Sequence, residues 1–162
     1  MTLIELSLHL PNRPGQLAEI ARLLAQKQIN VASIHVDSKG ARGDVRLVVS
    51  DPKGALVLLK KMGYAVQTHE LVAIQLEDKA GSFLKVLDCL TDAGINIQHV
   101  VLLVQREGNR TLVGLGLDDL TRARRILRSQ GFLAPGAERL VSNSDLIAAV
   151  PSIPSESVGL ML

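Results

Sequence analysis

The sequence predicts an α+β fold built from two similar antiparallel units, and two observations carry this prediction. The first is an internal repeat. The stretch PNRPGQLAEIARLLAQKQINV, residues 11–31, is followed 66 residues later by EDKAGSFLKVLDCLTDAGINI, residues 77–97. The second is the order of hydrophobic periods, because strand-like and helix-like spacings follow one another in the same order in both halves. A chain of 162 residues is long enough for two small domains.

The repeat is marked by identical residues at equivalent positions. At an offset of 66 the identical pairs include Leu10 and Leu76, Gly15 and Gly81, Leu24 and Leu90, Ile29 and Ile95, and Asn30 and Asn96. Farther along the chain the offset grows to 67 and then 68, as loop insertions would produce, because loops tolerate changes of length. Two copies of one structural unit are therefore the preferred interpretation.

The first copy contains six predicted elements. Residues 2–10 alternate between apolar and polar side chains, which predicts a half-buried strand with Glu5, Ser7 and His9 on its polar face. The segment Pro11 to Gly15 ends this strand, and apolar residues at helical spacing then predict an amphipathic helix. The remaining elements are predicted as strands over 29–37 and 42–50, a helix over 52–62 and a strand over 65–69.

The second copy repeats this order. Its elements are predicted as a strand over 72–76, a helix over 80–93, strands over 95–106 and 109–117, a helix over 118–130 and a strand over 132–141. This order, found twice, is the ferredoxin-like βαββαβ arrangement, in which both helices cover one face of an antiparallel sheet. We place the units at 1–70 and 71–142, followed by a C-terminal tail over 143–162.

The duplicated turn before each first helix is the candidate functional feature. A glycine lets the backbone approach a ligand closely, and a helix N-terminus offers unpaired N–H groups that favour a carboxylate. Asn12 and Asp78 stand three residues before the two glycines, where a short polar side chain could contact a bound ammonium or hydroxyl group. Asn30 and Asn96 stand where each helix leads into the next strand.

These residues carry a resemblance to a known family. NRPGQLAEIARLLAQKQINV resembles the ACT domain, an amino-acid-sensing module whose signature is an Asp/Asn-x-Pro-Gly-x-Leu turn, a helix, and an Asn-Ile or Asn-Val step. The first copy has every position of this signature. The second copy has Ala80 in place of the proline and Phe83 in place of the leucine. The resemblance covers residues 2–141.

The resemblance implies a stand-alone regulatory protein that binds a small amino acid where ACT units meet. Serine-responsive members have an NRPG turn preceded by a histidine, and Leu10 stands at that histidine's position here. An alternative is a regulatory subunit of an amino-acid biosynthetic enzyme that binds no ligand. A homodimer is expected, because the second strands are predicted sheet edges. The implied ligand-binding residues are Asn12, Arg13, Pro14, Gly15, Gln16, Leu17, Asn30, Val31, Asp78, Gly81, Ser82, Phe83, Asn96 and Ile97.

Each candidate residue also has a purely structural interpretation. The glycines could serve only as tight turns, and the asparagines could end helices in a left-handed backbone conformation. Gln16 and Ser82 could be solvent-exposed residues of a first helical turn, and Phe83 a core residue. Cys89 is interpreted as a small hydrophobe of the core, not a nucleophile.

Several function classes find no support in the sequence. The four histidines lack the spacing of a metal site, and no nucleophile–base or paired-carboxylate set stands out. We therefore expect no catalysis, metal or cofactor. The net charge of +2 does not indicate nucleic-acid binding, and RNA-binding domains of this topology need aromatic residues on the sheet. The basic run at 122–130 is interpreted as a solvated helix face.

The location is also inferred from composition. The first residues lack the basic leader and cleavage site of a signal peptide, and no apolar run reaches the roughly 20 residues that span a bilayer. A single cysteine forms no internal disulfide. A cytoplasmic protein that does not enter the membrane is therefore expected.

Overall fold

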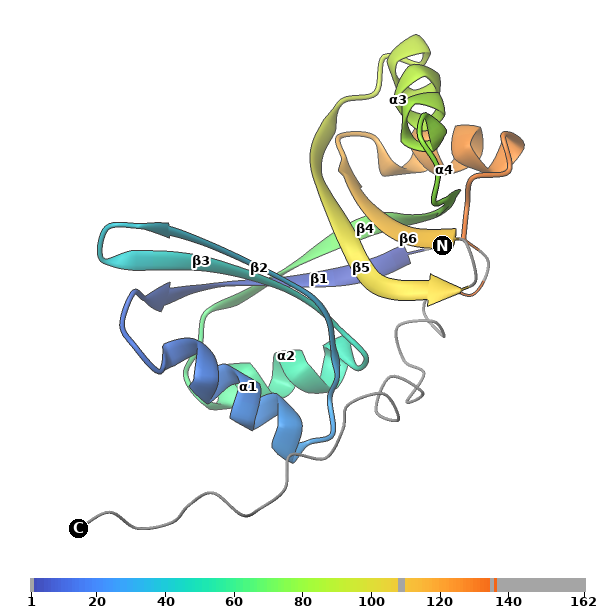
Figure 1. The fold of residues 1–162 in the computed structure, drawn as a ribbon. Helices are drawn as coiled ribbons and strands as arrows, with labels where there is room; N and C mark the ends of the chain where they lie inside the picture. Colours follow the sequence, from blue (N-terminus) through green and yellow to red (C-terminus); the bar gives the residue numbers. More distant parts are fainter. Residues whose placement is uncertain (1, 108–109, 135, 137–162) are drawn as a thin grey trace, which may run out of the picture.

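The computed structural model describes residues 2–107, 110–134 and 136. Over these residues the chain forms one six-stranded antiparallel sheet and four helices (Figure 1). The strands are β1 (Thr2–Pro11), β2 (Val31–Lys39), β3 (Arg42–Val49), β4 (Val66–Glu77), β5 (Ile97–Glu107) and β6 (Arg110–Leu117). The helices are α1 (Gln16–Gln26), α2 (Pro52–Lys61), α3 (Ser82–Asp92) and α4 (Leu120–Ser129).

The strand order is β2-β3-β1-β4-β6-β5, and all neighbours are antiparallel. The first four strands have the order expected for a ferredoxin-like unit, and β4, β6 and β5 repeat it for the second copy. The predicted α+β class with tandem ferredoxin-like units is therefore confirmed.

Strand β4 joins the two units. The sequence predicted separate strands over 65–69 and 72–76, and this prediction was wrong, because one continuous strand of 12 residues spans both. Its first part pairs with β1 over Val66–Val72, and its second part pairs with β6 over Val72–Glu77. Residues 67–70 are polar and exposed, and for this reason the sequence predicted a break between two strands. They lie where β4 passes from the core under α1 and α2 to the core under α3 and α4.

The chain after α4 returns to the sheet beside β4. Leu133 forms a bridge with Ile74, supported by Gln75 N–H donating to Phe132 O at 3.0 Å and Ala134 N–H donating to Ala73 O at 3.1 Å. Leu133 therefore pairs with β4 just beyond Val72, where the pairing of β1 with β4 ends. The predicted strand over 132–141 begins here, and its part beyond residue 136, like the tail over 143–162, lies outside the described residues.

Each helix pair packs on its own part of the sheet (Figure 1). The alternate apolar residues of each strand face the helices, and each amphipathic helix turns its apolar stripe towards them. The first core includes Leu6, Leu8, Leu10, Ile20, Leu24, Val45, Leu47 and Leu59. The second core includes Val72, Ile74, Val86, Leu90, Val113, Leu115 and Leu127.

A third core lies on the face of the sheet that carries no helix. The strongly twisted sheet curls so that the edge strand β5 contacts β2 (Figure 1). The buried residues of this core are Leu3, Ala32, Val48, Leu71, Ala73, Leu103, Leu112 and Ala134. Glu5, which the alternation placed on a polar face, is only 2% exposed for this reason. The sequence prediction of a half-buried first strand was therefore wrong at Glu5.

Candidate ligand site

The two predicted glycine turns have the same backbone geometry. Gly15 precedes α1 with φ 90°, and Gly81 precedes α3 with φ 83°, both in the left-handed region that favours glycine. In the first turn Gln16 N–H donates to Arg13 O at 3.4 Å, and in the second Ser82 N–H donates to Lys79 O at 3.2 Å. A Cβ atom added at either glycine would meet no atom within 4 Å. The space beside both turns is therefore open.

The helices that follow these turns differ from the other two in their capping. Asp51 and Asp119 cap α2 and α4, since their Oδ1 atoms accept hydrogen bonds of 2.9 Å from Gly54 N–H and Arg122 N–H. Neither α1 nor α3 has a capping hydrogen bond from a side chain. Apart from Gln16 N–H and Ser82 N–H, which bond within the turns, the first-turn N–H groups of α1 and α3 are thus not occupied by a side-chain cap, which leaves them available to an anionic group.

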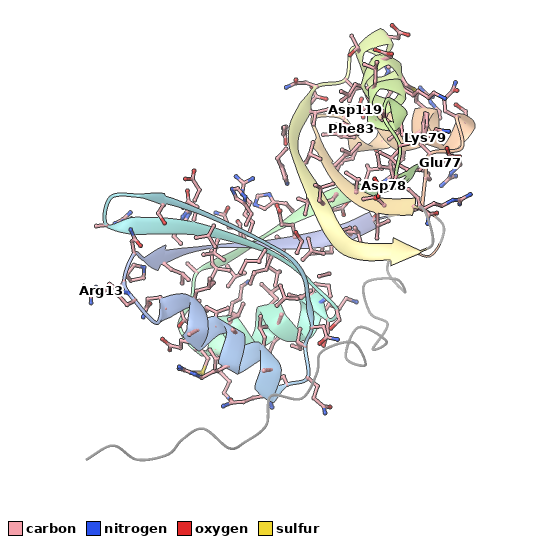
Figure 2. All side chains as sticks on the ribbon, viewed as in Figure 1. Arg13, Glu77, Asp78, Lys79, Phe83 and Asp119 are labelled. Carbon is pink, nitrogen blue, oxygen red and sulfur yellow. The ribbon has the colours of Figure 1, made fainter. Side chains whose placement is uncertain are left out.

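A cavity of about 320 Å³ lies beside the second turn. Asp78, Lys79, Ser82 and Phe83 form its wall at the start of α3. Figure 2 shows Asp78, Lys79 and Phe83 near one another at this end of the molecule. The facing wall is made of strand residues, namely Leu76, Val100, Leu102, Thr111 and Val113. The cavity therefore combines a helix N-terminus, charged side chains and an apolar wall.

A second cavity of about 340 Å³ adjoins the same turn and is rich in cations. Lys79, Lys85 and Arg110 line it together with Glu77. The pKa of Glu77 lies below its ordinary value, chiefly because Lys79 hydrogen-bonds and attracts its carboxylate, and Arg110 and Lys85 add attraction. The surroundings of the second turn thus favour negative charge.

The first turn lies at the opposite end of the molecule, as the positions of Arg13 and Asp78 in Figure 2 show. Asn12 ties this turn to the β2–β3 hairpin, because its Nδ2 donates to Gly40 O at 3.0 Å and its backbone N–H donates to Ala41 O at 2.9 Å. Pro14 and Gln16 belong to the same turn and first helical residue, and Leu17 is 39% exposed. The two turns of one chain therefore do not face each other.

The two asparagine steps are held by the ends of neighbouring strands. Asn30 N–H donates to Ser50 Oγ at 2.9 Å, and Asn96 N–H donates to Asp118 Oδ1 at 3.1 Å. Val31 is exposed at the start of β2, whereas Ile97 packs against the second core. The described geometry gives these residues a structural role at the strand starts.

The structure also shows what the sequence prediction missed at this site. Ser82 was interpreted as a solvent residue but is buried, at 9% exposure, on the wall of both cavities. Val100 and Leu102 were not predicted, although both line the cavity. A signal was present, since they stand 66 residues after Ile34 and Val36 and all four are exposed apolar residues of edge strands.

Other candidate groups have ordinary surroundings. No group of three metal-ligating side chains occurs among the described residues. Within the basic run, Arg124 pairs with Glu70 at 2.8 Å, whereas Arg122, Arg125 and Arg128 are exposed on α4. Cys89 is half-buried, and its pKa is raised by burial and by the nearby Asp92 carboxylate, which disfavours a nucleophilic thiolate. No helix in the described part of the chain is long and apolar enough to span a membrane.

Two ferredoxin-like units that share a sheet, each with an uncapped helix after a glycine turn, define a tandem domain of the ACT class. Residues 1–135 match the family model of the ACT domain pair, and the chain belongs to this family. Among curated proteins, none matches the chain in sequence.

Solved structures share the fold. The protein BT0572 from Bacteroides thetaiotaomicron is 26% identical, with a TM-score of 0.81 over 88% of this chain and 98% of that one. The regulatory subunit of aspartate kinase from Thermus thermophilus is 18% identical, with a TM-score of 0.56 over 78% of this chain and 91% of that one. The corresponding subunit from Thermus flavus is 17% identical, with a TM-score of 0.53, over 79% of this chain and 89% of that one.

Proposed function

We propose that this protein is a stand-alone regulatory protein of the cytoplasm that binds a small amino acid beside the turn at Gly81. The observation that carries the proposal is the cavity of about 320 Å³ between the uncapped start of α3 and the edge of the sheet. Cavities of this volume are in the size range of small-molecule sites. Membership of the ACT domain pair family supports the same function.

The chemistry of the cavity fits the three parts of an amino acid. The first-turn N–H groups of α3 would receive the carboxylate, because they carry partial positive charge. The Asp78 carboxylate on the same wall would attract the ammonium group. Phe83, Val100 and Leu102 would contact an apolar side chain. Gly81, Asn96 and Ile97 complete the proposed set in this unit by shaping the turn and the strand start.

The first unit is proposed as an unequal, second position for the same kind of ligand. Its turn keeps Arg13, Pro14 and Gly15, and Gln16, Leu17, Asn30 and Val31 surround the start of α1 and β2. However, Asn12 is engaged with the hairpin. We therefore expect weaker binding here than beside Gly81. The proposed units are residues 1–70 and 71–142.

A homodimer would complete the site. The edge strands β2 and β5 end the sheet, and each exposes apolar side chains, which on β5 line the cavity beside the start of α3. Ile34 and Val36 are 49% and 46% exposed, and Val100 and Leu102 are 43% and 66% exposed. Pairing of such edges between two chains would cover these side chains and close the open side of the cavity.

The second candidate is a non-catalytic subunit of an amino-acid biosynthetic enzyme that binds no ligand. The shared fold with regulatory subunits of aspartate kinase favours it. In this case the exposed apolar edges would dock on the enzyme, and no amino acid would affect stability. A pull-down that recovers a biosynthetic enzyme, together with the absence of any ligand effect, would support this candidate over the first.

A thermal-shift series across the twenty amino acids tests the first candidate. A ligand at about 100 times its Kd stabilises the folded state by about 2.7 kcal/mol, which corresponds to roughly 5–10 °C in a chain of this size. One small amino acid is expected to raise the Tm of the wild-type protein. The same amino acid is expected to leave Gly81→Asp unchanged, because a carboxylate at residue 81 would occupy the start of α3.

The matched control is Gly63→Asp. Gly63 has φ 88° and open space around it, like Gly81, but follows α2 in the first unit and does not line the cavity beside Gly81. Both variants therefore suffer the same backbone strain, and only one changes the proposed site. The absence of any amino-acid-dependent shift in the wild-type protein at millimolar concentration would refute ligand binding. If Gly63→Asp lost the amino-acid-dependent rise in Tm to the same extent as Gly81→Asp, binding beside Gly81 would be refuted.

A further inference from the structure

The cavity of about 340 Å³ beside the second turn has a chemistry that the amino-acid site does not use. We call it the cationic cavity, because Lys79, Lys85 and Arg110 line it. It shares residues at the start of α3 with the cavity of about 320 Å³. Its far wall is different, since it consists of residues 130–133 after α4, whereas residues of β5 and β6 wall the other cavity. The two cavities therefore lie beside one helix start and have different partners.

The cationic cavity has more positive charges than its own carboxylate can pair. Lys79 forms an ion pair with Glu77. The pKa of Glu77 is lowered first by its hydrogen bond with Lys79 and further by the charges of Arg110 and Lys85, so that the three cations lie around one carboxylate. Within residues 2–107, 110–134 and 136, Lys85 and Arg110 take part in no ion pair. Two cations of the cavity are therefore left for an anionic guest.

Ser82 is the buried polar side chain of this cavity. The residue is 9% exposed and lines the cavity wall at the start of α3. Its backbone N–H donates to Lys79 O within the turn, but its hydroxyl has no hydrogen-bond partner in the described part of the chain. Buried polar groups nearly always have a partner, because leaving one unpaired costs free energy. The Ser82 hydroxyl is an independent sign of a polar guest.

The fold directs the two unpaired cations to the same place. Arg110 opposes Glu77 in the register of β4 and β6, and its Nη1 donates to Gln75 Oε1 at 3.4 Å. This bond uses one of the five N–H donors of the guanidinium group. Lys85 stands three residues after Ser82, which places both on one side of α3. Strand β6 and helix α3 therefore each bring one cation to the cavity.

The wall after α4 depends on a left-handed glycine. Gly131 has φ 74°, which lets the chain leave α4 and return to β4. The N–H groups of Gly131 and Phe132 donate to Arg128 O at 3.1 Å and to Leu127 O at 2.9 Å, so these carbonyl groups at the end of α4 are already bonded. Phe132 and Leu133 add an apolar surface to the wall. A guest with an anionic end and a short carbon chain would contact both parts.

We propose that the cationic cavity binds a small phosphate monoester, independently of any amino acid beside Gly81. A phosphate group carries a charge of about −1.5 to −2 at neutral pH and three strong acceptor oxygens. These match the charges of Lys85 and Arg110 and the Ser82 hydroxyl, and the N–H groups at the start of α3 add partial positive charge. A carboxylate has a single charge and two oxygens, and so would leave one cation unpaired. Phe132 and Leu133 contact the carbon chain of the ester.

Isothermal titration calorimetry of the full chain tests the proposal, with glycerol 3-phosphate as the probe. We expect saturable binding that weakens as the salt concentration rises, because salt screens the attraction between exposed charges. Glycerol lacks the phosphate, and glycerate has a carboxylate on a three-carbon chain in its place. Both are expected to bind at least tenfold more weakly. Equal affinity for glycerate, or no binding of glycerol 3-phosphate, would overturn the proposal.

Variants locate the binding. Lys85 and Arg110 are exposed, so that Lys85→Gln and Arg110→Gln leave the cores intact. Each is expected to weaken binding of glycerol 3-phosphate by about tenfold, as loss of a hydrogen bond to a charged group does. Lys53→Gln is the matched control, because Lys53 is an exposed lysine in the first turn of α2 and lies outside the cationic cavity. Unchanged affinity in both cavity variants, or an equal loss in Lys53→Gln, would overturn the location.

Discussion

The imidazole of His99 lies against the backbone of Gly116, its cross-strand partner, at a position that no side chain on residue 116 could share. The contact belongs to the helix-free face, where the second unit covers β1 of the first. A glycine inside a strand ordinarily costs stability, because its unfolded state has more conformational freedom. At residue 116 this cost is offset because the absence of a side chain lets the His99 ring pack against the backbone.

Gly116→Ala is therefore expected to destabilise the protein by about 1–3 kcal/mol, as overpacking typically does. The new methyl group would displace His99 and leave the buried Glu5 carboxylate without its neighbour. Denaturant unfolding measures the change. The control is Gly114→Ala, whose Cβ would meet the flexible end of Leu71 at 2.9 Å and is expected to cost less.

A double-mutant cycle separates this contact from general strain. If the methyl group acts by displacing the ring, Gly116→Ala in a His99→Ala background should cost little, because the ring is already absent. Equal costs of Gly116→Ala in the two backgrounds would show that His99 is not the group displaced.

The sequence predicted those parts of the fold that depend on local signals. The turns at Gly15 and Gly81 follow from their surroundings, since a glycine before an apolar helical period marks a helix start. The order of strands and helices along the chain followed from the repeat, whereas their union in one six-stranded sheet did not. The burial of Glu5 could not be predicted, because it depends on contact with His99, which lies 94 residues away in the sequence. Local alternation contains no information about such a partner.

The candidate site was predictable to a similar extent. Asp78, Ser82 and Phe83 line the cavity because they belong to the turn and helix start that the repeat indicated. The strand wall at Val100 and Leu102 was not predicted, since it depends on how β5 lies beside α3. The sequence did not predict β4 as one continuous strand for a related reason. The strand contributes residues to two separate cores, and the polar residues between these two parts were interpreted as the end of one strand and the start of the next.

The aspartate caps are expected to matter equally in the two units. Asp51 and Asp119 have nearly the same backbone angles, with φ −128° and φ −125°, and each accepts one hydrogen bond of 2.9 Å. Replacing either by alanine should cost about 0.5–2 kcal/mol, as loss of an N-cap does. Thermal unfolding of the single variants measures this cost. A cost near zero for Asp119→Ala would show that the basic residues of α4 stabilise the helix without the cap.

The exposed edge of the second unit is expected to mediate dimer formation. Leu102→Lys places a charge on the 66% exposed apolar edge of β5 and should shift the protein towards the monomer. Val57→Lys is the control, because Val57 is 68% exposed on α2, away from the sheet edges. Light scattering at micromolar concentration measures the molar mass. A wild-type monomer, or equal effects of both variants, would contradict pairing through β5.

The single tyrosine provides a pH-dependent readout of the first core. The pKa of Tyr64 is raised above its ordinary value of 10.0, chiefly because burial disfavours the phenolate, and further because its hydroxyl hydrogen-bonds to the negatively charged Glu19. The phenolate absorbance of the native protein should therefore appear above pH 10, and that of the unfolded protein near pH 10. Glu19→Gln is expected to lower the native midpoint only in part, because the burial remains.

The same shift determines how stability changes with pH. Since the folded state holds the phenol proton more tightly than the unfolded state, the stabilising contribution of Tyr64 is complete below pH 10 and is lost as the pH rises through the folded pKa. Tyr64→Phe removes this titration and should reduce the alkaline loss of stability. A Tyr64→Phe variant with the wild-type alkaline profile, or a native midpoint at or below 10, would show that α1 and Tyr64 do not form the contact described here.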